Sequence, residues 1–278
     1  MDTQNDAPVG ALRVLVSGCL GKMGTEVVKA VEAAEDMILV GGYDPLLSVD
    51  SVMIEGKELA PAFTNLREAI RIAEPTVMVD FTQPSAAAGN VEIALGLGVN
   101  CVLGTTGVSA STLEELAAGA TNGAALFMAP NFTTGAILMM AASKLAARFF
   151  DDVEIIEFHH NNKKDAPSGT AIATAHMIAS ERNAAGVSST APGRETELPT
   201  FEGARGAELI NSDVHLHSVR SNGFVASQEV IFGSSGQTLT IRHDSFDRSS
   251  YMPGVLLAVR KVGEMDGLVI GLEELMQL

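Results

Sequence analysis

Short apolar runs alternate with helical periodicity over the first 130 residues of the chain. Between the first two runs, Met23, Val27, Val31 and Ala34 recur at the spacing of one helix face, and a serine-rich start precedes a second helical segment at 111–118. Strands that alternate with helices are typical of βαβ units around a parallel sheet. The strands predicted on this basis are 12–17, 37–43, 76–81, 100–103 and 125–128.

The pattern changes after residue 131. A long helix is predicted at 134–150, followed by a strand at 153–158 and a helix at 168–180. Residues 182–206 are rich in Gly, Pro, Ser, Thr and Glu and show little periodicity. A long loop is predicted there, either a lid over a site or a variable surface loop.

Three β-type runs follow this loop, at 214–219, 224–232 and 237–243. Glycine-containing turns join them, so an antiparallel meander is expected. Helical character then returns at 249–262. The whole pattern predicts an α/β fold, with a Rossmann-like parallel-sheet domain and a second domain of the α+β type.

The chain carries 18 basic and 34 acidic residues, a formal charge of −16. This charge repels polyanions, so no nucleic-acid partner is expected, and an anionic ligand needs a local cluster of cations.

Cys19 and Cys101 are too few for a disulfide framework and fit no metal site, so no metal and a reducing compartment are expected. The first ten residues lack an apolar leader, and no run approaches the roughly 20 apolar residues of a membrane span. A soluble, cytoplasmic protein is expected.

A glycine-rich turn directly follows the first predicted strand. It has the spacing GxxGxxG, with Leu20 where the commoner GxGxxG has its second glycine. Glycine lets the backbone approach phosphates, and the free N–H groups at the following helix start attract a pyrophosphate. The turn therefore predicts a dinucleotide site, although similar turns also join strands to helices in proteins that bind no nucleotide.

Asp44 ends the second predicted strand, where an acidic side chain can accept hydrogen bonds from the ribose hydroxyls of the adenosine half. This position favours NADH. Pro45 follows, so no adjacent cation awaits a 2′-phosphate, but Lys22 in the glycine turn could serve. Because aspartate is also a common turn former, NADH, NADPH and a purely structural role all stay open.

The segment from His159 to Thr170, HHNNKKDAPSGT, concentrates histidine and lysine in an otherwise acidic protein. Ser168 is a candidate N-cap, and the N–H groups of Gly169 and Thr170 offer an anion site at the helix start. Histidine exchanges a proton near neutral pH, and lysine can hold an anion or donate a proton to a developing amine. This combination suits the reduction of an anionic, imine-like substrate.

The same segment resembles the signature of the 4-hydroxy-tetrahydrodipicolinate reductase family, formerly called dihydrodipicolinate reductase. The family pattern E-x-H-H-x-x-K-x-D-A-P-S-G-T-A is matched by Glu154 to Glu157 followed by His159 to Ala171. Further matches occur in the same order along nearly the full chain: the glycine turn, Asp80 to Pro84, Gly104 to Gly107, Ala129 to Phe132, Arg248 and Gly254.

The resemblance implies roles for individual residues. His159 would be the acid/base residue and Lys163 the proton donor to the substrate nitrogen, while His160, Ser168, Gly169 and Thr170 would hold the substrate carboxylates. The residues implied to line the cofactor, NADH and/or NADPH, are Gly18, Cys19, Leu20, Gly21, Lys22, Met23, Asp44, Gly104, Thr105, Thr106, Ala129, Pro130, Asn131, Phe132, Arg248 and Tyr251. Thr105 and Thr106 could instead serve only to cap their loop.

The resemblance also implies an organisation and a reaction. The family fold places a dinucleotide-binding domain at 1–132 plus 245–278, around a substrate-binding and tetramerisation domain at 133–244. The implied reaction reduces 4-hydroxy-tetrahydrodipicolinate, a cyclic dicarboxylate, to tetrahydrodipicolinate by hydride transfer from NAD(P)H with loss of water. This step belongs to lysine biosynthesis via diaminopimelate. A homotetramer is expected by analogy.

Two other functions are compatible with parts of the pattern. One is another two-domain NAD(P)-dependent oxidoreductase, such as a semialdehyde or amino-acid dehydrogenase. A semialdehyde dehydrogenase would need a nucleophilic cysteine, and Cys101 has no histidine or cation near it in sequence. A non-catalytic NAD-sensing regulator would bind the cofactor without turnover. That function leaves the segment from His159 to Thr170 unexplained.

Overall fold

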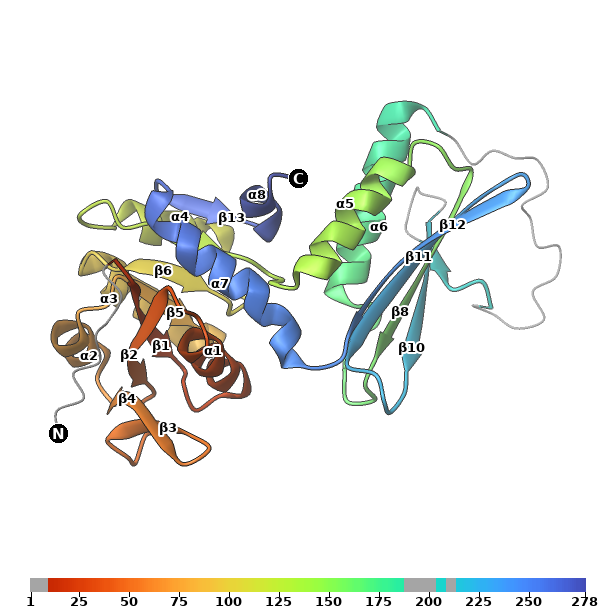
Figure 1. The fold of residues 1–278 in the computed structure, drawn as a ribbon. Coiled ribbons are helices and arrows are strands. Elements are labelled where there is room, and N and C mark those ends of the chain that lie inside the picture. The colour runs from red at the N-terminus through yellow and green to blue at the C-terminus, as the bar shows by residue number, and fades with distance from the viewer. Residues whose placement is uncertain (1–9, 188–203, 209–213) are drawn as a thin grey trace. The chain divides into compact units, whose positions relative to one another are not determined.

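A computed structural model describes residues 10–187, 204–208 and 214–278 (Figure 1). The chain divides into two compact units. Unit 1 comprises Met1–Thr134 and Arg248–Leu278, and unit 2 comprises Gly135–Asp247. The second unit is therefore an insertion between two segments of the first.

Unit 1 is built on an eight-stranded sheet with the order β13-β7-β6-β5-β1-β2-β4-β3. All neighbouring strands run parallel except β3, which is antiparallel to β4 at the edge. The strand order reverses between β1 and β5, and ligands of such sheets bind beyond the carboxyl ends of the strands at this point. The strands are β1 (Leu12–Ser17), β2 (Met37–Tyr43), β3 (Ser51–Ile54), β4 (Lys57–Phe63), β5 (Val77–Asp80), β6 (Asn100–Leu103), β7 (Leu126–Met128) and β13 (Leu268–Ile270).

Helices cover both faces of this sheet because its central strands are apolar on both sides. Helices α2 (Leu66–Ala73), α3 (Pro84–Gly96) and α4 (Ala110–Ala118) pack on the face that carries Leu15 and Met78. Helices α1 (Lys22–Glu32) and α7 (Met252–Lys261) contact each other as well as sheet strands, and short α8 (Leu272–Met276) contacts α7. The sequence pattern did not predict β3, β4, α2, α3, β13 and α8.

Unit 2 is a five-stranded sheet with the order β12-β11-β8-β10-β9. The strands are β8 (Asp152–His159), β9 (Ala207–Glu208), β10 (Val214–Arg220), β11 (Ala226–Ser234) and β12 (Gln237–Ser245). The predicted antiparallel pairing of β11 with β12 is confirmed. The rest of the predicted meander is wrong, because β8 lies between β10 and β11, parallel to the first and antiparallel to the second. The apolar residues Val153 and Ile155 place β8 at the buried centre of the sheet.

Two helices, α5 (Thr134–Ala146) and α6 (Gly169–Ala185), accompany this sheet (Figure 1). Their small buried residues pack on the side of β8 that carries Val153 and Ile155. The predicted start of the loop at residue 182 is too early, because α6 continues to Ala185. Arg182 is a buried residue of this helix, and its guanidinium donates hydrogen bonds to the carbonyls of Phe150 and Asp151. Residues 188–203 of that predicted loop lie outside the described residues. Among the described residues, no helix has the length and apolarity needed to cross a bilayer.

Candidate functional site

The glycine turn after β1 is held tight by close backbone contacts. Gly18 has a φ of +80°, and its carbonyl oxygen accepts a 2.9 Å hydrogen bond from the N–H of Gly21. A Cβ on Gly24 would overlap the same carbonyl oxygen. Gly21 is the N-cap of α1 and supplies no side chain to the first-turn N–H groups of the helix. These groups stay open to an anionic ligand, so the turn fits a dinucleotide pyrophosphate.

Asp44 follows β2 and lies close to this turn. Burial raises the pKa of the Cys19 thiol to about 11, and the negative charge of Asp44 adds to the rise. Cys19 is therefore a neutral thiol that packs in the turn. Oδ1 of Asp44 accepts a 3.0 Å hydrogen bond from the N–H of Leu46, so this side chain does stabilise a turn.

Asp80, at the carboxyl end of β5, organises the neighbouring turns from a fully buried position. Its Oδ2 accepts hydrogen bonds from Ser17 Oγ at 2.7 Å and Asn90 Nδ2 at 2.9 Å. Its Oδ1 accepts from both the N–H and the hydroxyl of Thr82, and from Thr105 Oγ1 at 3.2 Å. One carboxylate thus ties together the ends of β1, β5 and β6, where the sheet order predicts a ligand.

The turns after β5, β6 and β7 also pack on one another. A Cβ on Gly104 would overlap the Phe81 ring, whose centroid lies 5.8 Å from that of Phe132. A Cβ on Gly254 of α7 would overlap the Phe132 carbonyl oxygen. The backbone N–H of Ala129 donates to the Leu103 carbonyl. These close approaches explain why glycine occupies both positions.

The structure brings most of the predicted cofactor residues to the carboxyl end of the unit 1 sheet. Lys22, Thr106 and Pro130 are exposed there, and Asn131 is partly buried and accepts a hydrogen bond from the Thr133 N–H. Residues Arg248–Tyr251 form a short 3-10 helix that contacts α1, the helix after the glycine turn. All sixteen predicted cofactor residues therefore belong to one unit.

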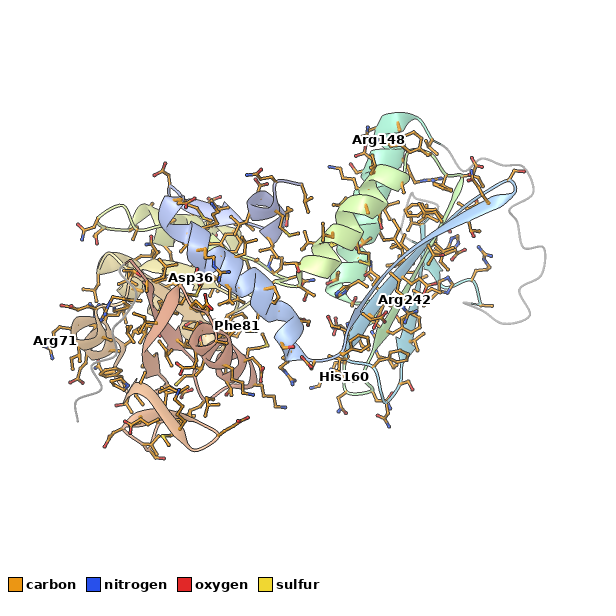
Figure 2. The ribbon with its side chains drawn as sticks, viewed as in Figure 1. Asp36, Arg71, Phe81, Arg148, His160 and Arg242 are labelled. Carbon is orange, nitrogen blue, oxygen red and sulfur yellow. The ribbon has the colours of Figure 1, made fainter. Side chains whose placement is uncertain are left out.

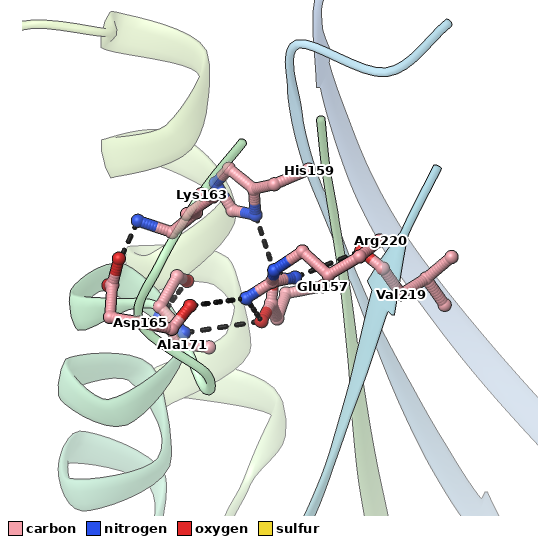
Figure 3. A network of polar contacts seen from close by, with 8 residues as sticks. Glu157, His159, Lys163, Asp165, Ala171, Val219 and Arg220 are labelled. Atoms are coloured by element: carbon pink, nitrogen blue, oxygen red, sulfur yellow. Dashed lines mark hydrogen bonds and ion pairs between the residues drawn. The ribbon is translucent and has the colours of Figure 1, made fainter. Parts of the chain in front are cut away.

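The basic segment of unit 2 centres on Glu157, a fully buried acid on β8 (Figure 3). Its Oε2 lies 2.5 Å from Nδ1 of His159, which is two residues further on the same strand. Arg220 of β10 donates two hydrogen bonds, at 2.7 and 2.8 Å, to the two oxygens of the same carboxylate. The N–H of Ser168 donates a further bond to Oε1 at 3.2 Å.

The charges in this network shift two pKa values. Burial alone would raise the pKa of Glu157, but hydrogen bonds from Arg220, Ser218 and His159 hold it below its usual value. Burial lowers the pKa of His159, and the positive charges of Lys163 and Arg220 lower it further. The carboxylate of Glu157 raises this pKa but does not outweigh the other effects. His159 is therefore predominantly neutral at neutral pH and gains a proton only when a ligand or acid favours it.

The loop between β8 and α6 holds the remaining predicted residues. Lys163 Nζ lies 2.9 Å from Oδ2 of Asp165, and the Lys163 N–H donates to the His160 carbonyl. His160 itself is exposed (Figure 2). Ser168 is the N-cap of α6, where its Oγ accepts from the Ala171 N–H at 3.2 Å, as predicted.

The helix start leaves room for an anion. Gly169 is exposed, and a Cβ there would meet nothing within 4 Å. The first-turn N–H groups of Gly169 and Thr170 have no intrahelical partner, because an α-helix supplies none at its first turn. His159 at the end of β8, Lys163 in the following loop and the start of α6 belong to one continuous segment of unit 2.

Sequence reasoning missed three members of this network: Glu157 as the partner of His159, Asp165 and Arg220. Glu157 could have been found, because strand alternation places it on the face of Val153 and Ile155. Arg220 could not, because it lies one residue beyond the strand predicted at 214–219, and the sequence pattern does not place that strand beside β8.

A Rossmann-type sheet with a dinucleotide turn, and a separate unit with a histidine and lysine segment, define a nicotinamide-dependent oxidoreductase. Residues 12–132 match the family described as dihydrodipicolinate reductase, N-terminus, and residues 135–276 match its C-terminal counterpart. The chain belongs to this family, which is now called 4-hydroxy-tetrahydrodipicolinate reductase.

Individual relatives agree with this assignment over nearly their full lengths. The 4-hydroxy-tetrahydrodipicolinate reductase of Gloeothece citriformis (strain PCC 7424) is 44% identical over 273 residues, which cover 95% of this chain and 97% of that protein. The Nocardia farcinica (strain IFM 10152) enzyme is 45% identical over 271 residues, covering 96% and 99%. A dipicolinate-bound dihydrodipicolinate reductase from Paenisporosarcina sp. TG-14 is 40% identical with a TM-score of 0.81, covering 95% and 99%.

The predictions of the family, of the α/β fold class and of an NAD(P)H-dependent 4-hydroxy-tetrahydrodipicolinate reductase are confirmed. The expected place in lysine biosynthesis via diaminopimelate follows from the same reductase name. Cys101, which the semialdehyde dehydrogenase alternative would need as a nucleophile, is fully buried, and burial raises its pKa far above the usual thiol value.

Proposed function

We propose that this chain reduces its cyclic dicarboxylate substrate with His159 and Lys163 as the proton-transferring residues of unit 2. The observation that carries the proposal is the contact between His159 and the buried Glu157, in the same segment as Lys163 and the helix start at Ser168. A histidine held by a carboxylate, a lysine and an open helix N-terminus together suit a substrate that is both anionic and proton-accepting.

Each residue has a distinct task in this mechanism. A reduced nicotinamide cofactor, held by the glycine turn and Asp44 of unit 1, would supply the hydride for the substrate ring. Lys163 attracts the dianion and donates a proton to the ring nitrogen, and His159 exchanges the proton that accompanies loss of the 4-hydroxyl as water. His160 and the N–H groups of Gly169 and Thr170, with the Ser168 turn, hold the carboxylates.

The proposed cofactor site lies at the carboxyl end of the unit 1 sheet. The glycine turn from Gly18 to Met23 would hold the pyrophosphate, since its close backbone contacts leave no space for larger side chains. The carboxylate of Asp44 would accept hydrogen bonds from the ribose hydroxyls, which favours NADH over NADPH. The turns at 104–106 and 129–132, with Arg248 and Tyr251, would line the remainder of the cofactor.

The proposed domain roles follow from these sites. We assign cofactor binding to 1–132 plus 245–278, and substrate binding and assembly to 133–244. The helices of unit 2 cover one face of its sheet, and the other face carries Phe158, with the Arg242 guanidinium 5.0 Å from the centre of its ring. A homotetramer formed through this sheet is proposed by analogy.

A cytoplasmic location is proposed because both cysteines are free and buried.

A direct assay tests the proposed function. The protein is mixed with freshly generated product of the preceding synthase, and nicotinamide absorbance is followed with NADH and with NADPH. We expect oxidation of the cofactor only when both substrate and protein are present, and faster turnover with NADH. Absorbance that stays constant with both cofactors would refute the proposal.

A further inference from the structure

The register of the unit 2 sheet places three side chains around one another. Glu157 and His159 are two residues apart on β8, so their side chains share a face. Strand β10 runs parallel to β8 with Ser218 opposite Glu157 and Arg220 opposite His159. The buried acid, the histidine and the arginine are thus held in place by the pairing of two strands.

The carboxylate of Glu157 is surrounded by hydrogen-bond donors, and they hold its pKa below the usual value. Arg220 binds both of its oxygens, and the Ser168 N–H binds Oε1. Glu157 therefore stays ionised, and the proton of the short contact with His159 lies on Nδ1 of the imidazole. Nε2 is then the ring atom left for exchange with a substrate.

Arg220 also connects this pair to the loop between β8 and α6. Its terminal nitrogen donates a 2.7 Å hydrogen bond to the Asp165 carbonyl, and Asp165 in turn pairs with Lys163. Side-chain exposures of 1% for Glu157, 15% for His159 and 19% for Arg220 mean that solvent screens these charges only weakly. Removing the charge of any one of these residues should therefore change the electrostatic environment of the other two.

We propose that Glu157 and Arg220 are positioning residues that fix the ring orientation and tautomer of His159 and hold its proton affinity in balance. The proposal rests on the acid/base function proposed for His159. The charged groups that act on His159 are Glu157 on its own strand, Arg220 on β10 and Lys163 in the following loop, while its partner on β11 is the uncharged Ala226.

The two positioning residues predict opposite changes in the pH dependence. In Glu157→Gln, the carboxylate that favours the imidazolium is lost, so the apparent pKa of His159 in the pH profile of kcat/KM should move down. In Arg220→Gln, a cation beside the imidazole is lost and the Glu157 charge is no longer shared, so that pKa should move up. We expect kcat to fall about 10- to 100-fold in each variant.

A matched control exists on the same strands. Glu154 on β8 is shared by His217 of β10 at 2.6 Å and by Arg205, in the same combination of residue types but on the opposite sheet face. Glu154→Gln, in protein of unchanged assembly by size-exclusion chromatography, should leave the kcat/KM profile as in the wild type.

Long-range ¹H–¹⁵N spectra of the histidine rings give a readout that does not depend on turnover. The His159 signals are identified by their loss in His159→Gln, and the wild-type ring should be protonated on Nδ1 when neutral, a preference that weakens in Glu157→Gln. Unshifted profiles and tautomers in both positioning variants would overturn the proposal. Wild-type turnover in His159→Gln would instead remove the acid/base role, whatever the tautomer.

Discussion

Thr105 donates a hydrogen bond across 3.2 Å to the buried carboxylate of Asp80, although 25 residues separate the two in sequence. Both side chains are buried, with exposures of 6% and 0%. The same threonine hydroxyl lies 3.3 Å from the Thr82 carbonyl. This contact joins the turn after β6 to the turn after β5, so a threonine that could have been a simple loop cap is part of the frame beneath the proposed cofactor site.

Thr105→Val should therefore weaken both stability and cofactor binding. Loss of the hydroxyl removes one buried hydrogen bond to a carboxylate, which costs about 1.5–3 kcal/mol of unfolding free energy. Urea unfolding followed by circular dichroism measures this cost, and calorimetric titration measures the affinity for NADH. Thr105→Ser keeps the hydroxyl and should retain most of both, so equal losses in the two variants would contradict this role.

Replacement by alanine should change the free energy of unfolding in opposite directions at two glycines. Gly24→Ala places a methyl group against the Gly18 carbonyl oxygen and should destabilise the protein by about 3 kcal/mol, because a packed backbone gives way at a cost. Gly89 is an exposed residue inside α3, where a Cβ meets nothing within 4 Å. Gly89→Ala should stabilise by about 0.5–1 kcal/mol. Thermal and urea unfolding compare the two, and a stable Gly24→Ala would contradict the tight turn.

The sequence predicted the elements whose apolar residues alternate clearly or follow one helix face. Helix α3 was not predicted, because its alanines and glycines form no distinct apolar stripe along one face. Strand β4 contains Pro61, which is unusual inside a sheet and concealed the strand. These elements are specified by the surrounding packing more than by their own pattern.

The candidate site shows the same limit. A local motif identified His159, Lys163 and Ser168, because those residues lie close together in the chain. Arg220 reaches Glu157 only through the parallel pairing of β8 and β10, a contact between residues 63 apart in sequence. Such a pairing depends on strand order, which alternation along a single strand does not encode.

Removal of the two proton-transferring side chains should slow chemistry far more than it weakens cofactor binding. We expect His159→Gln and Lys163→Ala each to lower kcat by about 10²- to 10⁴-fold, the usual contribution of general acid–base catalysis. The affinity for NADH, measured by calorimetry, should stay close to the wild-type value, since both residues belong to unit 2. His176→Gln, at an exposed position of α6, is the control. Normal turnover in both variants would overturn the proposed roles.

Asp44→Ala should reduce NADH affinity more than NADPH affinity. Hydrogen bonds from ribose hydroxyls to a carboxylate contribute about 1.5–3 kcal/mol, so a tenfold or greater loss is expected for NADH. NADPH should lose less, because the variant also removes a negative charge that opposes the 2′-phosphate. Asp44→Asn retains an acceptor for the Leu46 N–H and separates this effect from the turn. Equal losses for the two cofactors in Asp44→Ala would assign the side chain to the turn alone.

Acidification should destabilise the folded protein through two histidines. Burial lowers the pKa of His159 and of His243 below the ordinary value of 6.5, outweighing the opposing carboxylates Glu157 and Asp244. The unfolded chain therefore binds more protons than the folded one just below pH 6.5, and the free energy of unfolding must fall as the pH drops through this range towards the folded-state values.

Urea unfolding at pH 7.5, 6.5 and 5.5 tests this expectation, at one protein concentration because assembly adds to apparent stability. His243→Gln should make the fall with decreasing pH less steep, since one of the two depressed titrations is gone. A wild-type protein that gained stability between pH 7.5 and 5.5 would show that the unfolded chain binds fewer protons than the folded one, the opposite of what burial of these two imidazoles requires.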